Sequence, residues 1–183
     1  MKRIVTLIIA LALLAPLNVL AQTYNVNPAH TTIQFKVKNL GMFNVKGVFD
    51  KFKGTVDIDD TDMSKSKVDV TIETTSINTD NGMRDKDLRS INFFDVAKYP
   101  AMTFVSTMVE TGTDTLKVTG NLTIKGVTKP VVLIVNGPKN LHGDLKRGAL
   151  ATATVNRQDF GISSGATIAD EVFITISTEL VKQ

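Results

Sequence analysis

Residues 116–125 read Leu-Lys-Val-Thr-Gly-Asn-Leu-Thr-Ile-Lys, so that apolar or small residues alternate with polar residues along the whole stretch. Successive side chains of a β-strand point to opposite faces, and the alternation therefore predicts a strand with one face in an apolar interior and the other in water. The same period of two recurs along the rest of the chain, at residues 33–37, 68–72, 102–108, 149–155 and 172–176.

Turn-forming residues separate these runs. Asp, Asn, Gly, Pro and Thr gather at residues 59–62, 111–114, 136–138 and 142–144, and such clusters are typical of loops between strands. About eight short strands with this spacing predict an all-β sandwich or a closed antiparallel barrel. Closure is favoured because it leaves no exposed strand edge.

One segment departs from the strand pattern. Between residues 83 and 96, Leu88 and Ile91 have helical spacing. Asp85 and Arg89 are four residues apart, and Arg84 and Asp87 are three apart, so that both pairs can meet on a helix. We therefore predict a short helical insertion near residues 83–96, preceded by capping side chains at residues 79–81.

The first 21 residues have the layout of a secretory signal peptide. Lys2 and Arg3 precede an apolar run, and Ala21 ends a small-residue cleavage site. An uncleaved anchor is the alternative.

Cleavage would leave one domain, residues 22–183, with 19 basic and 18 acidic residues and no cysteine. This balance gives no reason to expect nucleic-acid binding, and no disulfide can form. We expect a periplasmic or secreted protein.

Small residues on the inner face bear on a cavity. Ala149, Ala151, Ala153 and Gly120 all fall on the apolar phase of their strands. A barrel of about eight strands is either filled by its own side chains or holds one small ligand. The pattern leaves both outcomes open, because Phe, Met and Ile residues from facing strands can also fill the space.

Few motifs suggest catalysis or metal binding. Residues 161–165 match the G-x-S-x-G nucleophile motif, but no histidine follows Ser163, since the two histidines are His30 and His142. Two histidines without cysteine make a poor metal set. The acidic residues at 59–62 are interpreted as a solvated turn rather than a cation site, since the loop lacks the EF-hand glycine and closing glutamate. We expect neither a catalytic residue nor a metal.

Arg84 and Arg89 allow two interpretations. At a cavity mouth, their guanidinium groups could hold a phosphate or another polar head group. Alternatively, they pair with Asp85 and Asp87 and fasten the helix to the barrel. The second interpretation is favoured, because each arginine has an acidic partner at helical spacing.

The chain resembles the YceI-like proteins. The segments that carry the resemblance are residues 27–35, 45–54, 84–90, 93–96, 99–104, 120–128 and 157–161, in order over the mature chain. The resemblance implies a lipocalin-like, eight-stranded antiparallel barrel, usually periplasmic or secreted, with a long isoprenoid-type lipid in an apolar lumen. Asp87 stands where the family often has histidine, a change that bears on head-group binding, and no tryptophan lies near Tyr24.

Our leading hypothesis is non-enzymatic binding, transport or storage of a long apolar ligand, such as a polyisoprenoid or an isoprenoid quinone, with no other cofactor. The partners expected are this lipid and no nucleic acid, while transient membrane contact and homodimer formation stay open. Arg84 and Arg89 are the head-group candidates. The lumen candidates are Phe35, Val70, Ile72, Leu88, Phe93, Phe94, Phe104, Val118, Leu122, Ala151, Ala153 and Ile174.

Two rival hypotheses come from other classes. A small outer-membrane barrel needs an apolar outer band and aromatic girdles, whereas the outward positions here include Lys36, Glu73 and Lys117 and the chain lacks tryptophan. An exported enzyme of unknown reaction would use His30, Asp159 or Ser163. The spacing of these residues matches neither a catalytic triad nor a metal site.

Overall fold

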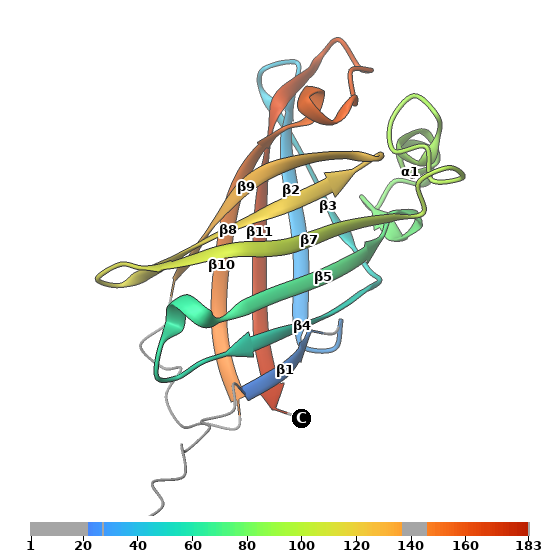
Figure 1. Ribbon diagram of the computed structural model, residues 1–183. Helices are drawn as coiled ribbons and strands as arrows, with labels where there is room; N and C mark the ends of the chain where they lie inside the picture. The colour runs from blue at the N-terminus through green and yellow to red at the C-terminus, as the bar shows by residue number, and fades with distance from the viewer. Residues whose placement is uncertain (1–21, 27, 137–145, 183) are drawn as a thin grey trace, which may run out of the picture.

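The alternating segments form one antiparallel sheet that curls on itself (Figure 1). This computed structural model describes residues 22–26, 28–136 and 146–182, so that the expected leader, the expected turn at 142–144 and His142 lie outside the described residues. The described strands are β1 (Gln22–Val26), β2 (Thr31–Asn39), β3 (Phe43–Phe49), β4 (Phe52–Ile58), β5 (Lys67–Glu73), β6 (Ile77–Asn78), β7 (Ala101–Thr111), β8 (Thr115–Ile124), β9 (Val127–Asn136), β10 (Lys146–Asn156) and β11 (Ile168–Lys182).

The eleven described segments occupy eight strand positions. β1 and β2 form one position, since both pair with β11. β3 and β4 form the next position, since β3 pairs with β2 and β4 pairs with β1. β5 and β6 form the third, since β6 pairs with β3 and β5 pairs with β4. Pairing of β1 with β11 completes the ring β1-β4-β5-β7-β8-β9-β10-β11. The prediction of an eight-stranded antiparallel barrel is therefore confirmed, with three of its strands interrupted by short irregular segments.

One seam of the wall is short. β9 pairs with β8 along its whole length, but it meets β10 only from Leu150↔Asn136 to Thr152↔Ile134. Beyond Thr152, β10 continues to pair with β11 while β9 does not follow it. The wall is therefore splayed between β9 and β10 in the half of the barrel that leads to residue 156.

The predicted helix is shorter than expected. α1 (Gly82–Arg89) begins where the Asn81 side chain accepts a hydrogen bond from the Arg84 N–H at 3.0 Å, and it ends at Ser90. The carbonyl of Ser90 then accepts from the N–H groups of Phe93 and Asp95, and this folds the rest of the segment into turns. The expected insertion at 83–96 is thus helical only in its first half.

The structure corrects the interpretation of Gly120 as a source of empty volume. A Cβ atom at Gly120 would collide with the ring of Phe104 and would lie 2.7 Å from the carbonyl oxygen of Val105. The glycine therefore makes room for the Phe104 ring, which fills the space that a larger side chain would take.

Gly120→Ala is expected to destabilise the barrel by about 1–3 kcal/mol, because the added methyl group overpacks a closed contact that includes backbone. Urea unfolding of the purified protein measures this. Gly148→Ala is the matched control on β10, since nothing lies within 4 Å of its built Cβ atom. Equal midpoints for the two variants would contradict the assignment.

Candidate lipid-binding cavity

The barrel encloses a cavity of about 750 Å³, within the range of roughly 300–1,000 Å³ that small-molecule sites occupy. Its lining is almost entirely aliphatic and aromatic, and it comes from strands all around the barrel together with α1. The polar and charged members of the lining are Thr31, Gln34, Asn39, Ser66, Arg84, Asp87, Arg157 and Thr178. An apolar molecule in this cavity would therefore contact apolar side chains over most of its surface.

Eleven of the twelve lumen candidates line this cavity. They are Phe35, Val70, Ile72, Leu88, Phe93, Phe94, Phe104, Val118, Leu122, Ala151 and Ile174. Ala153 lies instead beside a second hollow on the outer face, although it packs against the core. Ala149 also lines the cavity, so two of the three alanines of β10 leave space in the lumen.

The cavity opens beside α1. Met83 and Asp87 belong to its lining and are nevertheless exposed, Met83 at 87%. The three charged lining residues lie toward this end, Arg84 and Asp87 on α1 and Arg157 in the 3₁₀ segment η4 (Arg157–Phe160) after β10. The interior is thus apolar, whereas charge is confined to the mouth.

Three phenylalanines link the mouth to the wall. The rings of Phe35 and Phe49 have centroids 5.8 Å apart, and the Phe94 ring meets Phe49 edge-on at 6.0 Å. Such tilted and edge-to-face pairs add favourable energy beyond the area that they bury. The turn after α1 is therefore packed onto β2 and β3, with Phe93 buried beneath it.

The two arginines of α1 donate hydrogen bonds to the segment that precedes the helix. Arg84 donates through Nε to the Thr79 hydroxyl and through Nη2 to the Thr79 carbonyl, both at 2.8 Å. Arg89 donates to the carbonyls of Thr75 and Ile77. Within the described chain, Arg84 and Arg89 do not form the ion pairs with Asp87 and Asp85 that their spacing predicts. Their guanidinium groups donate instead to these carbonyls and to the Thr79 hydroxyl. Arg84 lines the cavity and Arg89 does not.

Asp85 is the buried residue of α1. Its Oδ1 atom accepts hydrogen bonds from the N–H of Thr79 at 2.9 Å and from its hydroxyl at 2.6 Å. Together with Arg84, this carboxylate fixes the start of α1 to the segment that follows β6. The mouth-forming helix is therefore held at its base by hydrogen bonds to the buried Thr79.

Asp85→Ala is expected to cost about 1–3 kcal/mol, because it leaves two buried donors of Thr79 without an acceptor. Asp87→Ala, an exposed position two residues along the same helix, should change the unfolding free energy by less than about 0.5 kcal/mol. Thermal unfolding of both variants tests this, and equal effects would show that Asp85 does not anchor the helix.

Arg157 is a structural residue whose role the sequence did not reveal. Its buried guanidinium donates to the carbonyls of Ile162 at 2.7 Å and Ser164 at 2.6 Å. It also reaches the carbonyls of Gly165, Ile168 and Ala169, and it forms an ion pair with Asp170 at 3.2 Å. This side chain therefore organises the loop before β11, which brings Ile162 and Ile168 into the cavity lining.

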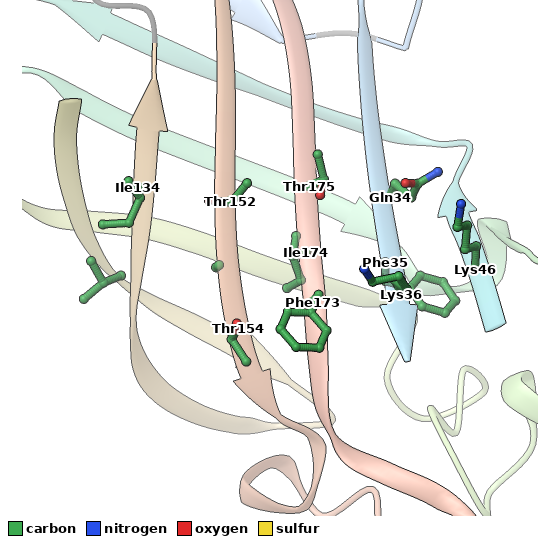
Figure 2. Close-up of a pocket in the computed structure, with 12 residues that line it drawn as sticks. Gln34, Phe35, Lys36, Lys46, Ile134, Thr152, Thr154, Phe173, Ile174 and Thr175 are labelled. Atoms are coloured by element: carbon green, nitrogen blue, oxygen red, sulfur yellow. The ribbon is translucent and has the colours of Figure 1, made fainter. Parts of the chain in front are cut away.

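The second hollow, of about 500 Å³, lies on the outer face of the wall. Figure 2 shows Ile134 of β9, Thr152 and Thr154 of β10, Phe173 and Thr175 of β11, and Gln34, Lys36 and Lys46 of β2 and β3. The Lys36 ammonium lies 5.3 Å from the centroid of the Phe173 ring. Hydroxyl and ammonium groups in an open groove suit an apolar chain less well than the inner cavity does.

The remaining sequence candidates are dispersed. His30, Asp159 and Ser163 are all exposed, and the Gly161-to-Gly165 motif is the loop that Arg157 holds, without the strand-to-helix turn of a nucleophile elbow. Among the described residues, no group of three or more His, Asp or Glu side chains is arranged to hold a metal ion. In that same part of the chain, no helix is long and apolar enough to cross a membrane.

In the acidic loop at 59–62, hydroxyl and backbone N–H groups of the loop and of Ser64 donate hydrogen bonds to the carboxylates of Asp59 and Asp62. The Thr61 hydroxyl, with the N–H groups of Asp62 and Thr61, holds the pKa of Asp59 below its ordinary value. The Ser64 hydroxyl lowers the pKa of Asp62 in the same way. These hydrogen bonds favour the ionised carboxylates, and the loop has the geometry of the solvated turn interpreted from the sequence.

Comparison with known proteins identifies relatives over nearly the whole domain. The sequence model of the YceI-like domain matches residues 24–180. A UPF0312 protein of Pectobacterium atrosepticum is 39% identical over 158 residues, which cover 84% of this chain and 82% of that protein. Protein YceI of Salmonella arizonae is 39% identical over 158 residues, with coverage of 84% and 83%.

Solved structures share the fold. BcnA of Burkholderia cenocepacia superposes with a TM-score of 0.76 at 25% identity, over 86% of this chain and 99% of that one. A YceI protein of Campylobacter jejuni gives 0.69 at 35% identity, over 80% and 89%. A polyisoprenoid binding domain from Saccharophagus degradans gives 0.65 at 15% identity, over 89% and 99%, and supports the fold alone.

Proposed function

Because the chain belongs to the YceI-like domain family, and because its barrel is hollow, we propose that it binds a long apolar molecule with a small polar head in the barrel lumen. The observation that carries the proposal is the cavity of about 750 Å³, whose wall is hydrocarbon and whose charged lining residues lie at its mouth. This distribution matches a polyisoprenoid or an isoprenoid quinone, with the tail inside and the head near α1.

Area burial supplies the driving force. An isoprenoid tail that buries about 400 Å² gains on the order of 10 kcal/mol, at roughly 25 cal/mol per Å². Association costs several kcal/mol in lost translational and rotational freedom. The balance permits reversible binding, as carriage or storage requires. The Saccharophagus degradans protein of the same fold is a polyisoprenoid binding domain, and we propose a ligand of the same class for this chain.

The residues at the mouth of the cavity would contact the polar head group of the ligand. Arg84 has both its Nε and Nη2 atoms engaged with Thr79, and Nη1 is the group that would contact a polar head. Asp87 is exposed and close by in sequence, and an acid at this position favours an uncharged or hydroxylated head over a phosphate. The signal peptide expected at residues 1–21 and the proposed apolar cargo are both consistent with our proposal of an exported, non-enzymatic carrier.

Mass spectrometry of the protein purified from its bacterial host tests the proposal. Native spectra should show an added mass, and solvent extracts should contain a prenyl-chain lipid. Uptake of a fluorescent farnesyl probe by delipidated protein should saturate at one probe per barrel. Absence of lipid from the extracts, combined with no probe uptake, would refute lumen binding.

A further inference from the structure

The most exposed large apolar side chains among the described residues gather at one end of the barrel. Leu40, Met42, Phe43, Met83 and Ile91 are 58–87% exposed, whereas the exposed apolar residues of the outer wall are 39–50% exposed. Single exposed apolar residues are ordinary, but a group of them marks an interaction site. We call these five residues the apolar rim.

The apolar rim lies at the end of the barrel where the cavity opens, since Met83 lines the cavity and so do Asn39 and Val45, which flank the loop between β2 and β3. Leu40 and Met42 lie in the three-residue loop between β2 and β3, and Phe43 follows it. Met83 lies in the first turn of α1, and Ile91 lies two residues beyond its end. Figure 1 shows this loop and α1 at the end of the barrel away from the C-terminus.

The ends of these elements are tied together. The Leu40 N–H donates to the Thr167 carbonyl at 2.8 Å, and the Lys125 ammonium donates to the carbonyls of Ile91 at 3.2 Å and Gly161 at 3.5 Å. The rim is therefore carried on a fixed frame. Met83 links it directly to the lumen, because the same side chain is 87% exposed and lines the cavity.

The residue type at Leu40 is not explained by the turn between β2 and β3. Leu40 has a φ of 52° and Gly41 a φ of 69°, and Lys125 and Gly126 take the same left-handed conformation between β8 and β9. Consecutive left-handed residues are the geometry of a tight hairpin turn, whose first position prefers Asn or Asp. A leucine that is 58% exposed at this position therefore contributes apolar surface that neither the turn nor the core requires.

The chemistry of the rim fits a lipid bilayer. The apolar rim is carried on two separate segments, residues 40–43 and 83–91, and through Met83 its exposed apolar surface is continuous with the apolar lining of the cavity. Nearby exposed charges are of both signs, with Lys38 and Lys86 against Asp80 and Asp87, so attraction to an anionic surface is weak. We propose that the apolar rim inserts into the bilayer surface. A lipid then passes between the membrane and the cavity without crossing water, and this transfer step rests on the proposed function.

Vesicle flotation tests the proposal. The rim variant carries Met42→Thr, Phe43→Thr and Ile91→Thr, and it leaves Met83 unchanged because Met83 lines the cavity. The matched wall variant carries the same number of apolar-to-threonine changes on the outer face, Met108→Thr, Val132→Thr and Leu150→Thr. On phosphatidylcholine vesicles, the rim variant should bind at least tenfold more weakly than the wild type, and the wall variant should bind normally, because interfacial binding follows the apolar area inserted. Salt at about 0.5 M should leave wild-type binding unchanged, since ions screen only charge attraction.

Probe transfer separates this inference from the proposed function. The rim variant should take up a fluorescent farnesyl probe from detergent solution like the wild type, but extract it from vesicles at least tenfold more slowly. Unchanged flotation of the rim variant, an equal loss in the wall variant, or release by salt would overturn the inference. So would a rim-dependent dimer in sedimentation without flotation. A wild type that floats but takes up no probe from solution would refute the cargo and leave the docking surface standing.

Discussion

Ala151→Trp is expected to weaken binding of a fluorescent farnesyl probe at least tenfold while leaving the barrel folded. Ala151 lies on β10 between Val135 of β9 and Ile176 of β11, and its methyl group faces the cavity. A tenfold loss corresponds to about 1.4 kcal/mol, or to roughly 60 Å² of lost apolar contact at about 25 cal/mol per Å². An indole ring carries about 150–250 Å² of surface and should displace at least that much ligand.

The neighbouring position on the same strand supplies the control. Thr152 points to the outer hollow, as Figure 2 shows, so that Thr152→Trp adds the same ring outside the lumen. Probe titration should give wild-type affinity for Thr152→Trp, and circular dichroism should show that both variants are folded. Wild-type affinity in Ala151→Trp, with the fold intact, would place the ligand elsewhere than the lumen.

The strand pattern of this protein could be predicted because burial acts on alternate residues. The inward positions of β8, such as Val118 and Leu122, are buried and line the cavity, and their period of two is visible in the sequence alone. By the same logic, eleven of the twelve lumen candidates line the cavity, and their contact with a ligand stays a prediction. Ala153 has the right phase, yet it lies where β9 has separated from β10, and strand separation leaves no trace in local periodicity.

Polar contacts between distant segments could not be predicted in the same way. The spacing of Arg84 and Arg89 favoured acidic partners on the helix, but both bind carbonyls of the preceding segment, residues 75–79. A backbone carbonyl is present at every residue, so sequence carries no signal for which one is chosen. The same holds for Gly120, whose small size serves the Phe104 ring on the neighbouring strand rather than the cavity.

Arg157→Met is expected to cause the largest loss of stability among these substitutions, about 3–5 kcal/mol. Methionine replaces the length of the side chain but none of its donors, and the carbonyls of Ile162, Ser164 and Ile168 lose their partners. Each buried carbonyl left unpaired costs about 1–3 kcal/mol, partly recovered where water enters. For a domain of this size, the melting temperature should fall by about 6–20 °C.

Differential scanning calorimetry measures the loss, and Gln158→Met is the matched control. Gln158 is the next residue, is exposed, and contacts the same Asp170 through its side-chain amide at 2.7 Å, so its replacement should shift the melting temperature by no more than about 2 °C. Hydrogen exchange should locate the Arg157→Met defect in residues 161–168, because the lost donors serve that loop. Because Ile162 of this loop and Ile168 at the start of β11 line the cavity, probe affinity should fall as well. A variant that keeps wild-type stability would show that the loop is held by its apolar contacts, with the guanidinium contributing nothing.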